Sequence, residues 1–357
     1  MVAEPFLEQT DLYISGTEGF HTFRIPSIVV TSRGTVLAFC EGRRDGRHDS
    51  GDIAMVLRRS EDGGRTWGAL QVVWEDEGNT CGNPCPVVDR DTGSIWLLMT
   101  HNLGSDTERQ IQERDSVGTR TVWVSKSEDD GVSWSHPIEI TDQTKRPEWT
   151  WYATGPGAGI QLRSGRLLIP CDHRVFEGGY FSHVIYSDDH GETWQLGGVA
   201  PADNVNECEV VELEDGRLLL NMRNYERTHT VRAVSTSRDK GITWSAVSYD
   251  QTLVDPICQA SIRRFTTREG SERDCVLFSN PASETTRENM TVRLSYDECE
   301  TWPLAIRLHG GPSAYSCLAV LPDGSVACLY ERGDEHRYER ITLARFNVEW
   351  LGDEAQP

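Results

Sequence analysis

Five copies of one short motif divide the chain into similar units and constrain its fold more than any other feature. The pattern is Ser-x-Asp-x-Gly-x-Thr/Ser-Trp, and its copies begin at residues 60, 127, 187, 237 and 295, at separations of 67, 60, 50 and 58 residues. Within such a box the Asp side chain accepts hydrogen bonds from backbone N–H groups ahead of it, Gly supplies a positive φ, and Trp packs the turn against a sheet. The fifth copy has Cys299 at the Gly position, which costs on the order of 1 kcal/mol if the turn keeps its shape.

Short apolar runs flank the boxes and the other Gly-containing turns, and no long pattern of helical period competes with them. The expected strands are residues 27–30, 35–39, 53–59, 121–125, 167–170, 218–221, 326–330 and 341–351. Four-stranded units of 50–60 residues that repeat radially form a propeller. The sequence therefore predicts an all-β fold, a six-bladed β-propeller of four-stranded antiparallel blades. Five blades carry a box and one does not, and strand 341–351 pairs with the N-terminal strands.

The composition limits the partners of this chain. We expect a single domain over residues 1–357, with a core of 11–351 and short tails, because no shift in composition marks a boundary. The formal net charge of −21 disfavours binding to nucleic acid and to anionic membranes. No apolar run reaches the ~20 residues of a membrane span. Residues 1–10 lack the pattern of a signal peptide, so a cytoplasmic location is expected.

Ten cysteines are scattered along the chain without a disulfide framework. Cys81 and Cys85 lie four apart, but no second pair with ligand spacing accompanies them. We interpret both as small core residues. The sequence accordingly predicts neither a metal site nor a cofactor.

The segment Phe23-Arg24-Ile25-Pro26, ahead of the run of boxes, resembles the sialidase family, and the resemblance extends over residues 13–351. It implies an exo-α-sialidase that releases terminal sialic acid from glycans or glycolipids with retention, through a tyrosine nucleophile. It also implies that Arg24 is the first of three arginines that bind the substrate carboxylate, placed just before a strand.

The same resemblance assigns two residues of the segment that begins at Asn206. Glu207 corresponds to the catalytic Glu of the family, and Arg223 to the second arginine. Glu209 and Glu212 lie close by in the sequence. Glu209 would share a face with Glu207 in a regular strand, so the motif, and not the chemistry alone, selects Glu207.

The third arginine should lie just upstream of the fifth box. Arg287 and Arg293 are both candidates, and Arg287 is favoured because the family arginine sits a few residues before the strand that leads into the box. Arg293 lies on that strand and remains the alternative.

Tyr315, in Gly-Pro-Ser-Ala-Tyr-Ser, resembles the nucleophile of the family. A carboxylate nucleophile would be repelled by the carboxylate on the anomeric carbon, and sialidases are the tyrosine exception among glycosidases. Ionising a free tyrosine at pH 7 would require roughly 4 kcal/mol, so Glu207 is expected to take its proton. The resemblance also implies that Asp49 is the general acid/base, because it lies 25 residues after Arg24 and the acid/base Asp of the family falls at about that distance. Asp45 and Asp52 are alternatives from the same loop.

Further residues match binding elements of the family. Glu331 resembles the acidic partner of the first arginine, and Arg43 resembles an arginine near the C4 side of the sugar. Residues 149–157 are interpreted as mainly structural, with a contact at the rim of the site, and Asn83 with Pro84 as a lining of the acetamido pocket. His48 is interpreted as a loop residue.

Two alternative functions follow from the same scaffold. A trans-sialidase differs in acceptor binding and not in these residues. A sialic-acid-binding lectin would keep the arginines but lose Tyr, Glu or Asp, and all three are present. The sequence predicts no linkage preference and no oligomeric state.

Overall fold

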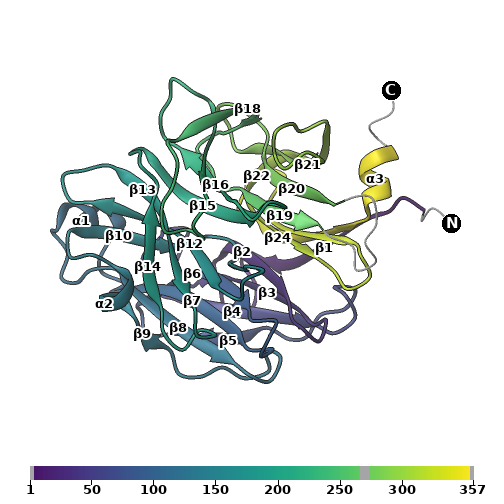
Figure 1. The fold of residues 1–357 in the computed structure, drawn as a ribbon. Helices are drawn as coiled ribbons and strands as arrows, with labels where there is room; N and C mark the ends of the chain where they lie inside the picture. The colour runs from purple at the N-terminus through teal and green to yellow at the C-terminus, as the bar shows by residue number, and fades with distance from the viewer. Residues whose placement is uncertain (1–3, 266–273, 354–357) are drawn as a thin grey trace.

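The computed structural model describes residues 4–265 and 274–353 and is built from antiparallel sheets (Figure 1). The first unit pairs β2 (Thr22–Val30), β3 (Val36–Arg43), β4 (Ile53–Ser60) and β5 (Gln71–Trp74). The second pairs β6 (Thr80–Val88), β7 (Ile95–Asn102), β8 (Thr121–Ser127) and β9 (Ile138–Glu139). A single parallel contact between β4 and β6 joins the two units into one sheet.

The next two units are separate sheets. The third pairs β10 (Trp149–Thr154), β12 (Leu167–Val175), β13 (Tyr180–Ser187) and β14 (Gln195–Val199), with β11 (Ile160–Gln161) beside β12. The fourth pairs β15 (Val205–Glu212), β16 (Leu218–Asn224), β17 (Val231–Ser237) and β18 (Ser248–Val254). All pairings within the third and fourth units are antiparallel. Strands make up nearly all of the regular structure in the described residues, so the sequence prediction of an all-β fold is confirmed.

The last sheet joins two sets of strands through the long strand β22 (Leu304–Val320). Residues 304–312 of β22 pair with β21 (Glu288–Ser295), which continues to β20 (Cys275–Pro281) and β19 (Ser261–Phe265). Residues 313–320 pair with β23 (Val326–Arg332), followed by β24 (Arg340–Phe346) and β1 (Leu7–Ile14). The predicted pairing of a C-terminal strand with an N-terminal one is thus confirmed, and both termini lie on the same side of the molecule (Figure 1).

Within residues 4–265 and 274–353, three short helices interrupt the strands: α1 (Glu108–Glu113), α2 (Thr141–Thr144) and α3 (Val348–Asp353). The expected strand 341–351 is wrong in its second half, because β24 ends at Phe346 and α3 follows. Asn347 marks the change: its side-chain Oδ1 accepts a hydrogen bond from the N–H of Trp350, 3.2 Å away, inside the helix. Among the described residues, no helix is long and apolar enough to cross a bilayer.

Each of the five boxes forms a turn between two strands, as predicted: β4 and β5, β8 and β9, β13 and β14, β17 and β18, and β21 and β22. In the first box Asp62 accepts hydrogen bonds from the N–H and the hydroxyl of Thr66, at 2.8 and 2.6 Å. The fifth box keeps this shape, because Cys299 has a φ of 71° and its N–H donates to Ser295 Oγ at 2.8 Å. The expected strain at Cys299 is therefore present as a left-handed backbone conformation.

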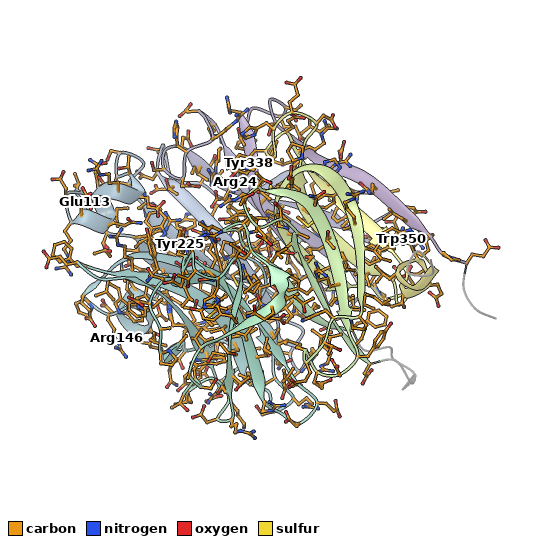
Figure 2. All side chains as sticks on the ribbon, turned by 90° about the horizontal axis from the view of Figure 1, so that it is seen from above. Arg24, Glu113, Arg146, Tyr225, Tyr338 and Trp350 are labelled. Carbon is orange, nitrogen blue, oxygen red and sulfur yellow. The ribbon has the colours of Figure 1, made fainter. Side chains whose placement is uncertain are left out.

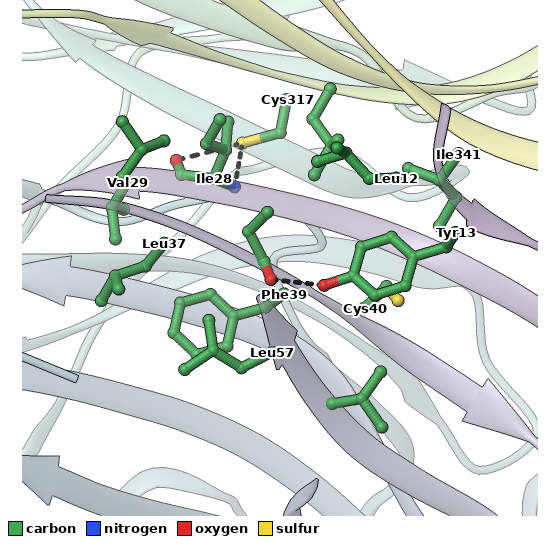
Figure 3. Close-up of a cluster of buried hydrophobic side chains, with 14 of the residues drawn as sticks. Leu12, Tyr13, Ile28, Val29, Leu37, Phe39, Cys40, Leu57, Cys317 and Ile341 are labelled. Atoms are coloured by element: carbon green, nitrogen blue, oxygen red, sulfur yellow. Dashed lines mark hydrogen bonds between the residues drawn. The ribbon is translucent and has the colours of Figure 1, made fainter. Parts of the chain in front are cut away.

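The strand β1 is held by the core as well as by its pairing. The hydroxyl of Tyr13 on β1 donates to the carbonyl of Ala38 on β3 at 2.7 Å, and its ring is completely buried. Figure 3 shows Tyr13 and Ile341 packed with residues of β2, β3 and β4. The chain ends are consequently tied to the first unit through side chains.

Cys81 and Cys85 are also buried, as predicted for core residues.

Candidate active site

The hydroxyl of Tyr315 lies between Glu207 and Arg223. Tyr315 comes from β22, Glu207 from β15 and Arg223 from β16, so three distant segments meet at this point. The phenol donates to Glu207 Oε1 and accepts from Arg223 Nη1 at 3.0 Å, while Arg223 Nη1 also donates to Glu207 Oε2. All three side chains are buried. The structure thus brings together the tyrosine, the carboxylate and the arginine that the sequence predicted to lie at one site.

Three arginines surround this tyrosine. Besides Arg223, the guanidinium of Arg24 lies 5.0 Å from the centre of the Tyr315 ring, and that of Arg287 lies 5.7 Å from it. Arg287 comes directly before β21, as predicted, whereas Arg293 lies within β21, where Asp250 is its charged neighbour. The geometry therefore favours Arg287 over Arg293 as the third arginine of the cluster.

The backbone around Arg24 is irregular. The pairing of β2 with β3 shifts register between Arg24 and Ser27, and Ile25 has a φ of 61°. Arg24 thus lies inside a bulged strand, and the expectation that it precedes the strand is wrong. Glu331 on β23 stabilises the bulge, because its Oε1 accepts from Arg24 Nε at 3.1 Å and from the N–H of Ile25 at 2.9 Å. This is the acidic partner that the sequence predicted for Arg24.

Asp49 lies on the loop between β3 and β4, with its side chain half exposed. Its Oδ1 accepts from Arg43 Nη2 at 2.8 Å and from Arg24 Nη1 at 3.4 Å. Arg43 also binds the carbonyl of His48 at 2.8 Å, which holds the loop against β3. Of the alternatives, Asp52 pairs with Arg44 at 3.4 Å, away from Asp49. His48 is a loop residue, as predicted.

The side chain of Glu209 does not join that of Glu207 beside Tyr315, although the two would lie on the same face of a regular strand. The pairing of β15 with β16 shifts register between Val205 and Cys208, which breaks the simple alternation of faces. Glu209 instead accepts from the hydroxyl of Ser261 and the N–H of Ile262, both at 2.8 Å. Glu212 forms a surface pair with Arg163 at 3.4 Å.

The pKa values of Tyr315 and Asp49 are shifted in opposite directions. Burial and the neighbouring Glu207 raise the pKa of Tyr315 well above its ordinary value, although Arg223, Arg287 and Arg24 act in the opposite direction. The phenol is therefore protonated in the free protein, and the arginines alone do not make it a phenolate. The pKa of Asp49 is lowered by Arg43 and Arg24 against the effect of burial, so its carboxyl is ionised in the free protein.

Several residues that the sequence reasoning missed complete the site. Figure 2 shows Tyr338 beside Arg24, and its ring lies 3.9 Å from the guanidinium of Arg24. The Tyr338 hydroxyl accepts from Arg287 Nη1 at 3.2 Å. Tyr225 accepts from Arg223 Nη2 at 2.7 Å. Tyr225 lies two residues after Arg223, so its period-2 spacing was a usable signal. Nothing in the sequence around Tyr338 distinguishes it.

A fully buried arginine, Arg120, lies on the side of the site toward β6. Its guanidinium donates to the side-chain oxygens of Asn83 and Asn102, and lies 4.0 Å from the ring of Trp151. The N–H of Asn83 donates to Glu41 Oε1 at 2.8 Å, and Glu41 also binds Arg43. Asn83 is thus connected to the arginine–carboxylate network, while its predicted role in an acetamido pocket stays a prediction.

The prediction that residues 149–157 are mainly structural is confirmed at two positions, Trp149 and Tyr152. Trp149 and Tyr152 are buried in a core shared by the second and third units, and the Trp149 ring stacks on His173 with ring centres 3.4 Å apart. The rim contact predicted for this segment stays a prediction.

One group in the described part of the chain has the spacing of metal ligands: Asp89, Asp91 and His190. Asp89 already accepts from Thr92 Oγ1 at 2.7 Å and from Gln161 Nε2 at 2.8 Å. The group belongs to a turn network and is not connected by any of these contacts to Tyr315.

Comparison with known proteins places this site in a family. A model of the BNR repeat-like domain matches residues 34–328. The chain is 38% identical to a sialidase of Micromonospora viridifaciens, and the match covers 99% of this chain. It is 31% identical to human sialidase-3, and that match covers 91% of this chain and 89% of the human protein. A solved structure, the Hadza microbial sialidase Hz136, superposes with a TM-score of 0.88 at 31% identity, over 96% of this chain and 69% of that one.

The fold and the repeats define a BNR repeat-like protein. Within that class the chain belongs to the sialidase family, because relatives of that family match it over nearly its whole length. The chain spans 56% of the M. viridifaciens relative and 62% of a sialidase of Bacteroides fragilis. A leech intramolecular trans-sialidase superposes with a TM-score of 0.82 at 20% identity, over 99% of this chain and 72% of that one, a likeness of fold.

Proposed function

We propose that the protein is an exo-α-sialidase that hydrolyses terminal sialosides with retention through Tyr315. The observation that carries the proposal is the hydrogen bond from the Tyr315 hydroxyl to Glu207, with Arg24, Arg223 and Arg287 around the ring. An arginine fork suits a carboxylate, and charge-assisted bonds of this kind are each worth about 1.5–3 kcal/mol. Three of them would hold the anomeric carboxylate of a sialic acid.

In the first step, the Tyr315 oxygen attacks the anomeric carbon while the bond to the leaving oxygen breaks. Glu207 takes the phenol proton, and Asp49 gives a proton to the leaving oxygen. Because the pKa of Asp49 is lowered by Arg43 and Arg24, this role requires the substrate to change its surroundings. The substrate carboxylate would do so by neutralising part of the charge of Arg24.

In the second step, Asp49 accepts a proton from water as the water oxygen attacks the anomeric carbon. The bond from that carbon to the Tyr315 oxygen breaks, and Glu207 returns its proton to the phenolate. Each attack inverts the anomeric centre, so two attacks give net retention. Glu331 and Arg43 position Arg24 and Asp49 and take no part in bond making.

We also propose that the four-stranded units form one closed six-bladed propeller and a single domain. Support comes from the split pairing of β22, which contributes to both the fifth and the sixth unit, and from the pairing of β24 with β1. The placement of Glu207, Arg24 and Tyr315 from three different units would then put the site on the central axis of the ring.

Substitution of Tyr315 by Phe tests the mechanism. We expect Tyr315→Phe to lower kcat on a fluorogenic α-sialoside by about 10³-fold or more, because the nucleophilic oxygen is removed. Binding of a sialic-acid-derived inhibitor should persist, since the three arginines are untouched. NMR of the product formed by the wild-type protein should show the α-anomer first.

The outcomes separate the alternatives. No hydrolysis by folded wild-type protein, beside an active control sialidase, would reject the enzymatic proposal. Binding without turnover that is equal in wild type and Tyr315→Phe would indicate a lectin. Transfer of sialic acid to added lactose would indicate a trans-sialidase.

A further inference from the structure

A hollow of about 420 Å³ lies outside the proposed active site. Its lining comes from α1 and the loop after it, from α2 and the loop after it, and from the start of β10. Figure 2 shows Arg146, one of its lining residues, apart from Arg24 and Tyr338. The volume lies in the range of small-molecule sites, roughly 300–1,000 Å³, so this hollow can hold a ligand of its own.

Positive charge is concentrated in this hollow. Arg114, Lys145 and Arg146 line it together with a single carboxylate, that of Asp142. Within residues 4–265 and 274–353, none of the three cations forms an ion pair. Two positive charges thus remain in excess here, although the whole chain carries −21. Cations gathered in this way repel one another, and a bound anion would relieve the repulsion.

Neutral oxygens hold Lys145 in place. Its Nζ donates to Thr119 Oγ1 at 2.8 Å, to the carbonyl of Arg120 at 2.5 Å and to that of Thr150 at 2.9 Å. These contacts fix the ammonium group at the hollow but do not neutralise its charge. Burial lowers the pKa of Lys145 to about 7, and Arg120 and Arg114 act in the same direction. No carboxylate offsets these effects, as an adjacent anion would.

The two arginines are oriented by aromatic rings and a carbonyl. The Arg114 guanidinium lies 4.6 Å from the centre of the Phe176 ring, and its Nη2 donates to the carbonyl of Pro147 at 3.1 Å. The Arg146 guanidinium lies 5.5 Å from the centre of the Trp149 ring. Such contacts position a guanidinium and leave donors free for an anion.

We propose that this hollow binds a phosphate group, either free phosphate or the monoester of a small molecule. A phosphate monoester carries about −1.5 to −2 charges at pH 7 and has three acceptor oxygens, which matches the excess of two positive charges. A carboxylate would neutralise only one of them. Guanidinium groups bind phosphate through paired hydrogen bonds. This site is separate from the proposed sialidase function and does not depend on it.

Titration followed by ³¹P NMR tests the proposal on the full chain at pH 7. The linewidths of inorganic phosphate and of glucose 6-phosphate are measured against protein concentration. A sialic-acid-derived inhibitor is present in excess, so that the arginines around Tyr315 are occupied. We expect a Kd of about 1 mM or lower for wild type, and about tenfold weaker binding for Arg146→Gln, through loss of one charge-assisted contact. The double variant Arg114→Gln/Arg146→Gln should bind more weakly still.

Arg109→Gln is the matched control. It removes the same charge from an exposed arginine of α1 that does not line the hollow, and its Kd should stay within about twofold of wild type. Arg146 is exposed, so its replacement should leave the fold intact. Binding of glucose 6-phosphate about fivefold tighter than that of phosphate would identify an organic phosphate as the ligand, and equal affinities would identify free phosphate.

Three results would overturn the proposal. The first is no saturable binding by wild type up to about 20 mM phosphate. The second is equal affinity in wild type, Arg146→Gln and the double variant. The third is stronger displacement of phosphate by free sialic acid than by sulfate, which would mark the hollow as a carboxylate site. The comparison between variants does not require the inhibitor to bind, so failure of the proposed function leaves this test intact.

Discussion

Glu331 takes no part in the proposed bond changes, yet its carboxylate holds three groups of the site. It binds the Arg24 guanidinium and the N–H of Ile25, and its Oε2 accepts from the N–H of Tyr315 at 3.1 Å. It is completely buried. One carboxylate therefore fixes the first arginine and the backbone of the proposed nucleophile relative to each other.

Replacing Glu331 by Gln removes the charge from this arrangement. Breaking a buried ion pair by removing one partner typically destabilises a protein by about 3–5 kcal/mol. Because Gln keeps an acceptor, we expect a loss of about 3 kcal/mol for Glu331→Gln in urea unfolding, together with a KM for sialosides that is at least ~10-fold higher.

The control is Glu18→Gln, which removes a carboxylate paired with Arg58 at 2.6 Å near the surface. Exposed pairs contribute about 1 kcal/mol or less. Equal losses in the two variants would contradict the role of Glu331 as a central brace.

At the scale of elements, Glu209 connects its own strand, β15, with β19 and with the segment that follows β10. It lies on β15, binds Ser261 and Ile262 of β19, and accepts from the N–H of Ala158 at 3.2 Å, after β10. Burial raises its pKa to about 7, although these hydrogen bonds and Arg263 lower it. The folded state therefore binds a proton between about pH 4.5 and 7 that the unfolded state has lost.

This proton makes the stability fall as the pH rises. The contribution of protonated Glu209 is fully present below its ordinary pKa and is lost as the pH passes through 7, with a total of about 3 kcal/mol. Glu209→Gln removes the titration. We expect the free energy of unfolding of this variant, minus that of wild type, to increase from pH 5 to pH 7.5 in urea titrations. Parallel curves for wild type and Glu209→Gln would refute the assignment.

The sequence predicted the elements well where local chemistry fixes them. Each box needs only its own Ser, Asp and Trp and a residue of positive φ, which is Gly in four copies and Cys299 in the fifth, so five turns and the strands beside them are readable without tertiary information. The helix α3 was missed because a single side chain, Asn347, ends the strand pattern there. The exchange of partners within β22 was missed because a strand shared between two units has no local signature.

The site was predicted to the extent that family motifs mark it. Arg24, Glu207, Tyr315 and Glu331 meet as the resemblance implied, although no periodicity in the chain brings them together. Tyr338, by contrast, contacts Arg24 from a loop more than 300 residues away in sequence. Such a contact depends on how distant units pack, which no short pattern records.

At the scale of the whole molecule, the charge of the site differs from that of the surface. The site brings together the four arginines at positions 24, 43, 223 and 287 and four carboxylates, Glu41, Asp49, Glu207 and Glu331, which form ion pairs with the first three of these arginines. The arginines are concentrated at this point, but the set of eight side chains has no net charge. The molecule as a whole carries −21, so a distant anionic substrate experiences repulsion and is attracted only at short range.

Salt should therefore accelerate the capture of substrate. The Debye length is about 30 Å at 0.01 M and about 8 Å at 0.15 M ionic strength, so added salt screens the distant surface charge and leaves the contacts inside the site largely unchanged. We expect kcat/KM for a monosialylated substrate to rise about 2–5-fold from 10 to 150 mM NaCl, with kcat nearly constant. The increase should be larger for a disialylated substrate, because its repulsion scales with its charge. A decrease with salt would instead mean that the arginines dominate the field outside the site and attract sialosides from a distance.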